Sequence, residues 1–70
     1  MRRVGAHEVI LSDRRLELAV VEIESSRVVN YYEFRDELPM TEWLGGTIRL
    51  KKAEDGELQA WWKDKLLEED

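Results

Sequence analysis

Two basic side chains and one tryptophan in the second half of the sequence have the residue types and spacing to hold an anionic or aromatic ligand. Arg49 and Lys51 lie in the alternating run 47–53, and Trp61 follows the turn sequence Glu54-Asp55-Gly56. A three-residue loop at this turn would bring all three side chains to one outward face. An aromatic ring beside two cations resembles the platforms that bind a small ligand or stack single-stranded nucleic acid. Cation–π packing on a strand surface is the structural alternative.

No set of catalytic residues is recognisable elsewhere in the sequence. His7 is the one histidine, and Glu8 beside it would point to the opposite face of a strand, so His7 lacks the orienting partner that a catalytic base or metal ligand needs. The carboxylates lie mostly in turns or alternate with apolar residues, which is typical of solvent-facing positions. We therefore expect no enzyme, no metal site and no cofactor.

Length and composition restrict the remaining possibilities. With 70 residues and no cysteine, the chain is predicted to form one small domain, 1–70, without disulfides. The formal net charge of −5 favours solubility and disfavours nucleic acid as a partner. No run approaches the roughly 18 apolar residues of a membrane span, and the short apolar run after Met1-Arg2-Arg3 is not a secretory signal. We expect a cytoplasmic protein without membrane association.

The elements that would position these residues are mainly strands. β-Branched and aromatic residues recur in short runs bounded by turn formers, which predicts strands at residues 6–11, 15–24, 27–34 and 47–53, with a long loop at 35–46. Residues 57–62 fit either a fifth strand or a helix, and residues 63–70 are predicted to be a short helix or a frayed end. The expected fold is a small antiparallel sandwich or a partly open barrel of about five strands.

Turn chemistry predicts the register of two hairpins. A two-residue loop at Ser25-Ser26 would pair Glu24 with Arg27, Ile23 with Val28, Val21 with Asn30, and Ala19 with Tyr32. The second face of this hairpin would then carry an apolar centre made of Leu18, Val20, Val29 and Tyr31. A three-residue loop at the later turn would pair Ile48 with Trp62, Leu50 with Ala60, and Lys52 with Leu58. Either another segment of the chain or a second copy is expected to cover the apolar centre.

One part of the chain resembles a known family in its pattern of strands and turns. The pattern consists of Ala6-His7-Glu8-Val9-Ile10-Leu11, Arg15-Leu16-Glu17, Ala19-Val20-Val21-Glu22-Ile23-Glu24, Arg27-Val28-Val29, Glu37-Leu38-Pro39 and Gly45-Gly46-Thr47-Ile48. It resembles the N-terminal β segment of metal-dependent amidohydrolases, which belongs to a small β-sandwich beside a catalytic barrel. The family's metal motif should follow, but Arg49-Leu50-Lys51-Lys52 stands there. The resemblance thus implies the β architecture of a vestigial subdomain and transfers no catalytic residue.

These observations favour a non-enzymatic β module. We expect it to form a homo-oligomer or to bind a protein partner through Leu18, Val20, Val29 and Tyr31. The alternatives are a module that binds a small molecule or single-stranded nucleic acid through Arg49, Lys51 and Trp61, and the vestigial amidohydrolase-like subdomain.

Overall fold

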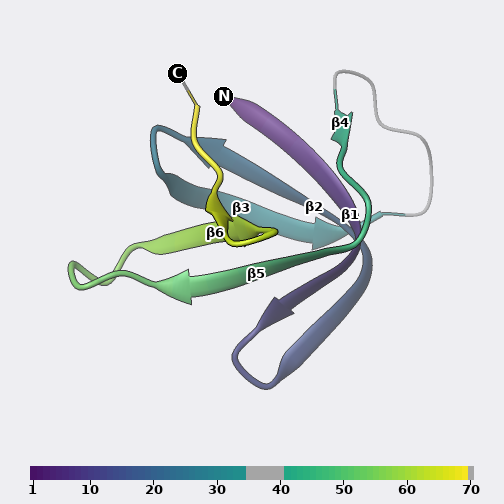
Figure 1. Ribbon diagram of the computed structural model, residues 1–70, viewed down its shortest axis with the longest axis horizontal. Coiled ribbons are helices and arrows are strands. Elements are labelled where there is room, and N and C mark those ends of the chain that lie inside the picture. Colours follow the sequence, from purple (N-terminus) through teal and green to yellow (C-terminus); the bar gives the residue numbers. More distant parts are fainter. Residues whose placement is uncertain (35–40, 70) are drawn as a thin grey trace.

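A single curled β-sheet makes up most of the molecule (Figure 1). The computed structural model describes residues 1–34 and 41–69. Its sheet order is β3-β2-β1-β5-β6-β7, with β4 paired to β1 beside that path. The strands are β1 (Arg2–Leu11), β2 (Arg14–Glu24), β3 (Arg27–Glu33), β4 (Glu42–Trp43), β5 (Thr47–Lys52), β6 (Leu58–Trp62) and β7 (Lys65–Leu66). The prediction of a mainly β chain is confirmed, whereas the sandwich of about five strands is wrong, because the described residues form one open sheet of seven strands.

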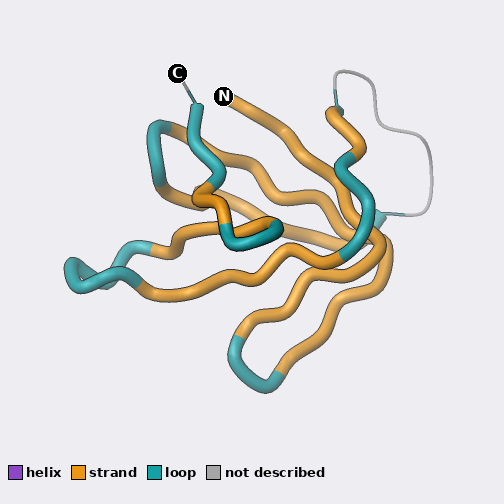
Figure 2. Tube along the Cα trace, in the orientation of Figure 1, coloured by secondary structure: helices purple, strands orange, loops and turns teal. Residues whose placement is uncertain are grey.

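The two longest strands bend, and this bend allows one sheet to enclose the core without a second layer. β1 pairs with β2 along its length, and its other side pairs in parallel first with β4 and then with β5. Core-facing and outward-facing residues alternate along each strand, but in β1 this alternation shifts by one residue between Ala6 and Val9. In β2 it shifts between Leu16 and Ala19. Leu18 lies within the shifted part of β2 and has a φ of 50°, so the backbone is not extended there. The sheet therefore wraps around one core instead of splitting into two layers (Figure 2).

The β2–β3 hairpin follows the predicted register only near its turn. The two-residue loop at Ser25-Ser26 pairs Glu24 with Arg27 and Ile23 with Val28, as expected. A bulge at Val29 then shifts the register, so that Val21 faces Tyr31 instead of Asn30. The predicted pair of Ala19 with Tyr32 is wrong for the same reason, because Ala19 faces Glu33. As a result Tyr31 packs against the core.

The β5–β6 hairpin has the predicted register throughout. Ile48 pairs with Trp62, Leu50 with Ala60, and Lys52 with Leu58. Gly56 closes the loop at a φ of 87°, a conformation that glycine adopts at little cost. Its N–H donates to the Ala53 carbonyl at 3.0 Å, and the Ala53 N–H donates to the Glu57 carbonyl at 2.8 Å. The strand interpretation of residues 58–62 is thereby confirmed over the helix.

The C-terminal segment turns back into the sheet, so the predicted helix or frayed end at 63–70 is wrong for its described part, 63–69. Lys63 and Asp64 form a turn with φ values of 50° and 64°, after which β7 pairs with the end of β6. Leu67 is 5% exposed, and its N–H donates to the Ala60 carbonyl at 2.8 Å. The Glu69 N–H donates to the Ser25 carbonyl at 2.7 Å. This segment therefore ties β6 to the β2–β3 turn.

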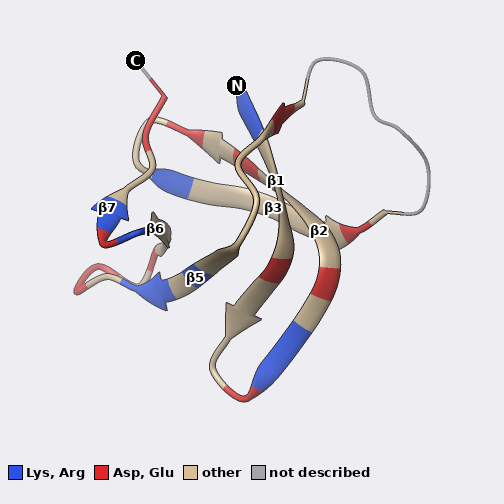
Figure 3. Cartoon of the chain, turned by 45° about the vertical axis from the view of Figure 1, so that its right-hand side comes forward, with Lys and Arg blue, Asp and Glu red and all other residues tan. Residues whose placement is uncertain are grey.

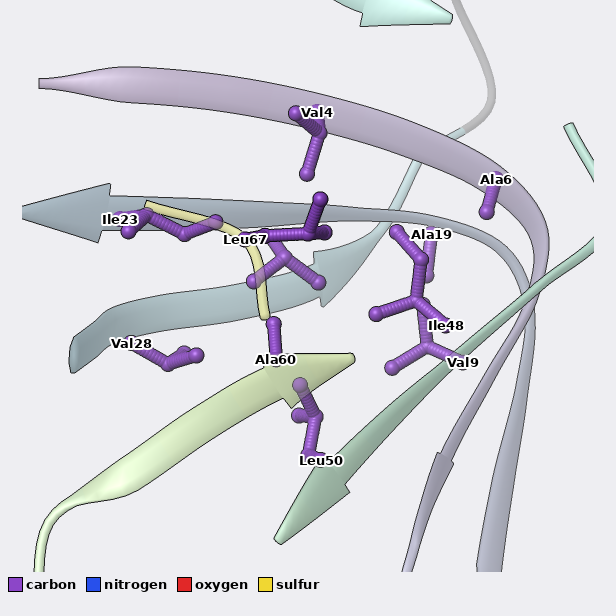
Figure 4. Packing of buried hydrophobic residues seen from close by; sticks show 11 residues of the cluster. Val4, Ala6, Val9, Ala19, Ile23, Val28, Ile48, Leu50, Ala60 and Leu67 are labelled. Atoms are coloured by element: carbon purple, nitrogen blue, oxygen red, sulfur yellow. The ribbon is translucent and has the colours of Figure 1, made fainter. Parts of the chain in front are cut away.

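The core fills the concave side of the curled sheet. Its buried members come from β1, β2, β3, β5, β6 and the C-terminal segment, and Figure 4 shows them pointing toward one another. They are Val4, Ala6, Val9, Ala19, Val21, Ile23, Val28, Ile48, Leu50, Ala60 and Leu67. Alternate residues of β5 and β6 must therefore face the convex side, where the candidate site lies. Of the predicted loop at 35–46, residues 35–40 lie outside the described part.

Candidate functional site

The three residues predicted as a ligand face come together on the convex side of β5 and β6. Arg49 and Trp61 are directly paired across the two strands, and the Lys51 Nζ lies 5.9 Å from the centre of the Trp61 ring. Together with neighbouring side chains they line a hollow of about 320 Å³. We call it the Trp61 hollow, and its lining residues are Thr47, Arg49, Lys51, Trp61, Lys63 and Asp64. Its volume is near the lower end of the range for small-molecule sites.

Sequence reasoning missed Lys63 and Asp64 because it assigned them to a helix or a frayed end. Both residues have left-handed backbone angles in the tight β6–β7 turn, which keeps them beside the end of β6. The Lys63 Nζ lies 4.7 Å from the centre of the neighbouring Trp62 ring. A Lys-Asp pair after a strand is a recognisable turn signal, since Asp tolerates positive φ. The turn adds one cation and one carboxylate to the hollow.

Unlike most basic groups of β1–β3, those of the hollow lack carboxylate partners among the described residues. In the described residues, the N-terminus and Arg2, Arg3, Arg15 and Arg27 all form ion pairs. Within the same part of the chain, Arg49, Lys51 and Lys63 form none. Figure 3 shows the basic segments of β5 and β7 on the same side of the molecule. The hollow thus carries three cations against the single carboxylate of Asp64.

Glu8 borders the hollow and is already engaged. The Thr47 hydroxyl donates to Glu8 Oε1 at 2.9 Å, and Arg15 forms an ion pair with the same carboxylate. The hydrogen bond from Thr47, followed by that from Arg15, lowers the pKa of Glu8, with a smaller contribution from the charge of Arg49. Because the Thr47 hydroxyl already donates its hydrogen bond to Glu8, the side chains of the hollow that remain to bind an anion are Arg49, Lys51 and Lys63.

His7 has a structural role in the approach to β5. Its Nδ1 accepts a hydrogen bond from the Gly46 N–H at 3.2 Å, and its ring centre lies 4.9 Å from that of Trp43 in an edge-on arrangement. The Trp62 indole N–H donates to the Gly45 carbonyl at 3.0 Å. These bonds hold the loop before β5 from both sides, which fixes where Thr47 begins the strand.

The four residues predicted as an interface do not form one apolar face. Val20 is fully buried, and Tyr31 lies against the core because of the bulge at Val29. Leu18 and Val29 are 48% and 42% exposed. The Trp43 ring lies over Gly5, the residue paired with Val20. Part of the expected apolar centre is therefore covered by the chain itself, and a role of the rest in association stays a prediction.

Other kinds of site find no support in the described residues. Among residues 1–34 and 41–69, no group of three or more His, Asp or Glu side chains is placed to hold a metal ion. The same residues contain no helix long and apolar enough to cross a membrane. Comparison with protein-family models, curated proteins and solved structures found no match. The resemblance to amidohydrolases therefore stays a prediction.

Proposed function

We propose that this chain is a non-enzymatic module that binds anionic ligands in the Trp61 hollow. The observation that carries the proposal is that Arg49, Lys51 and Lys63 line one small hollow together with Trp61 and form no ion pair with any described carboxylate. A cation without a partner loses less on binding an anion, because it need not first break an ion pair. Three such cations within one small hollow provide a local positive potential.

The negative net charge does not oppose this local attraction strongly. Screening in physiological salt limits the reach of exposed charges to about 8 Å. The molecule measures 34 Å along its longest axis, and Glu42, Glu68 and Glu69 surround the chain termini, where Met1 and Arg2 pair with two of them. The acidic groups tied to the hollow are Asp64, which lines it, and Glu8, which accepts a hydrogen bond from the lining residue Thr47. Glu8 is neutralised in part by Arg15.

Self-association through the predicted apolar face has less support than anion binding in the Trp61 hollow. Only Leu18 and Val29 of its four members are well exposed, and the bulge between β2 and β3 interrupts the face. Sedimentation of the wild type at micromolar concentration tests it directly. A dimer that Val29→Glu dissociates would favour association over anion binding as the main role.

Nuclear magnetic resonance titration with tripolyphosphate at low salt tests the proposal. We expect shifts of the Trp61 indole N–H and of the Arg49, Lys51 and Lys63 amides. Lys51→Gln and Lys63→Gln should each weaken binding about fivefold, which corresponds to the roughly 1 kcal/mol that one charge contributes near water. Arg14→Gln is the matched control, because Arg14 is exposed, makes no ion pair with the described residues and lies outside the hollow.

The three variants change the net charge equally, so only position distinguishes them. If Arg14→Gln weakens binding as much as the two lysine variants, general charge explains the titration and the proposed site is wrong. Absence of any shift at low salt would likewise reject it.

A further inference from the structure

A row of two basic and three apolar side chains crosses the convex side of the sheet at the Trp61 hollow. Ile10 of β1 pairs with Arg15 on one side and with Arg49 on the other. Arg49 pairs with Trp61, and Trp61 pairs with Leu66. Neighbouring strands are about 4.8 Å apart, so each member of the row touches or nearly touches the next. Arg49 therefore stands between an aliphatic side chain and an aromatic one.

A second hollow adjoins the first across β5. It measures about 540 Å³ and is lined by Ile10, Leu11, Ser12, Arg49, Leu50, Lys51 and Lys52. Arg49 and Lys51 line both hollows. On one side of this basic pair lies the Trp61 ring, and on the other side lies Ile10, whereas Leu11 packs against the core. The pair thus separates two places where a flat apolar group could rest.

On this basis, and resting on the proposed function, we infer that the ligand contains a nucleotide unit, with a phosphate at Arg49 and Lys51 and a base against Trp61. Arginine matches phosphate geometry with two parallel hydrogen bonds, and lysine adds a point charge. An indole stacks on any base, because every base has a π-face. A simple inorganic anion would contact the cations alone, whereas a nucleotide would contact the cations and the Trp61 ring together. Lys51, which lies over the Trp61 ring, would turn toward the phosphate.

The ligand could be a free nucleotide or part of a short single strand, which share this chemistry. The net charge of −5 disfavours long polyanions, as the sequence predicts, but its effect on one or two phosphates is limited by screening. A strand would place a second base against Ile10, whereas a free nucleotide would leave that hollow unoccupied.

Four probes separate these possibilities when each is titrated at the same low salt concentration. They are thymidine monophosphate, an oligothymidylate of about eight nucleotides, an abasic strand of the same length, and tripolyphosphate. The oligothymidylate should bind at least about fivefold more tightly than the abasic strand, which carries the same phosphates but no bases. Trp61→Leu should abolish this difference, and Arg14→Gln should preserve it. The comparison of the two strands needs only the wild-type protein, so it stands even if Trp61→Leu unfolds.

The outcomes distinguish this inference from the proposed function. Equal binding of the two strands, with tripolyphosphate still bound in the Trp61 hollow, overturns the nucleotide inference and leaves anion binding intact. Failure of every probe overturns both. A hexaglutamate peptide serves as a fifth probe, and its tighter binding than that of any base-bearing probe would also overturn the inference, in favour of an acidic protein partner. Shifts of the Ile10 and Leu11 amides with the oligothymidylate, but not with the monophosphate, support the single strand as the source.

Discussion

Replacement of Leu67 by alanine tests whether the C-terminal segment is part of the folded core. Leu67 is 5% exposed, and it belongs to the same buried cluster as Ile23, Val28 and Ala60. The adjoining backbone bonds to Ala60 and Ser25 do not depend on the side chain, so the substitution removes packing alone. The segment should remain in place, with a cavity where the leucine was.

The expected loss is large for a chain of this size. Removal of three buried carbons costs about 2.4 kcal/mol at roughly 0.8 kcal/mol for each, and measured Leu→Ala changes in cores range from about 2 to 5 kcal/mol. A 70-residue chain has a free energy of unfolding of roughly 4 to 10 kcal/mol. The variant should therefore lose between a quarter and most of its stability, with Tm falling by roughly 10 to 20 °C.

Urea denaturation followed by tryptophan fluorescence measures this loss. Leu18→Ala is the matched control, because the same atoms are removed from a side chain that is 48% exposed, and it should cost less than about 1 kcal/mol. If Leu67→Ala also costs less than about 1 kcal/mol, the end of the chain is frayed, as the sequence pattern suggests, and the docking of Leu67 is refuted.

Three further predictions concern the turns and the titrating groups. Gly56→Ala should destabilise the fold by about 1 kcal/mol in the same assay, since its φ is 87° but no atom within 4 Å would obstruct the added methyl group. Glu8→Gln should lower stability at neutral pH, and the difference from wild type should vanish in acid. Because the folded state lowers the pKa of Glu8, the ionised carboxylate contributes fully to the free energy of unfolding above the ordinary carboxyl range. This contribution is lost as pH falls through the lowered pKa. A difference between variant and wild type that does not depend on pH would contradict this. Tyr32 should ionise above its ordinary range, because burial and then the charge of Glu22 raise its pKa. The fold should then lose stability above about pH 10, because the phenol ionises more easily in the unfolded chain, and Tyr32→Phe should remove this loss. Phenolate absorbance measures the ionisation of Tyr32, and urea titrations at different pH values measure the loss of stability.

Local turn chemistry explains which parts of the fold are predictable from the sequence. Glu54-Asp55-Gly56 fixes the loop length because glycine is needed at the left-handed position, and the register of β5 and β6 follows from it. The same register puts Arg49, Lys51 and Trp61 on one face, so this part of the candidate site is predictable from the turn. In each case the controlling interactions lie within a few residues of the turn.

Features set by distant contacts are not predictable in this way. The bulge at Val29 has no distinctive residue, yet it moves Tyr31 from the outer face to the core. The parallel pairing of β1 with β5 joins segments about forty residues apart and depends on the shared core. Leu67 is one of two leucines in a charged tail, and its burial depends on the space that the curled sheet leaves open. These features decide whether the fold is a sandwich or one curled sheet.

The Trp61 hollow should keep its anion affinity when the packing of the Leu67 side chain is lost. Arg49, Lys51 and Trp61 are held by the β5–β6 hairpin, and Lys63 lies in a turn that the pairing of β7 with β6 closes. Under conditions where Leu67→Ala remains folded, tripolyphosphate should therefore bind it about as tightly as it binds the wild type, because the Leu67 N–H still donates to the Ala60 carbonyl. The double variant of Leu67→Ala and Lys63→Gln should bind about as weakly as Lys63→Gln alone. A loss in Leu67→Ala as large as the loss in Lys63→Gln would show that the leucine side chain positions Lys63, and the segment would then not remain in place without it.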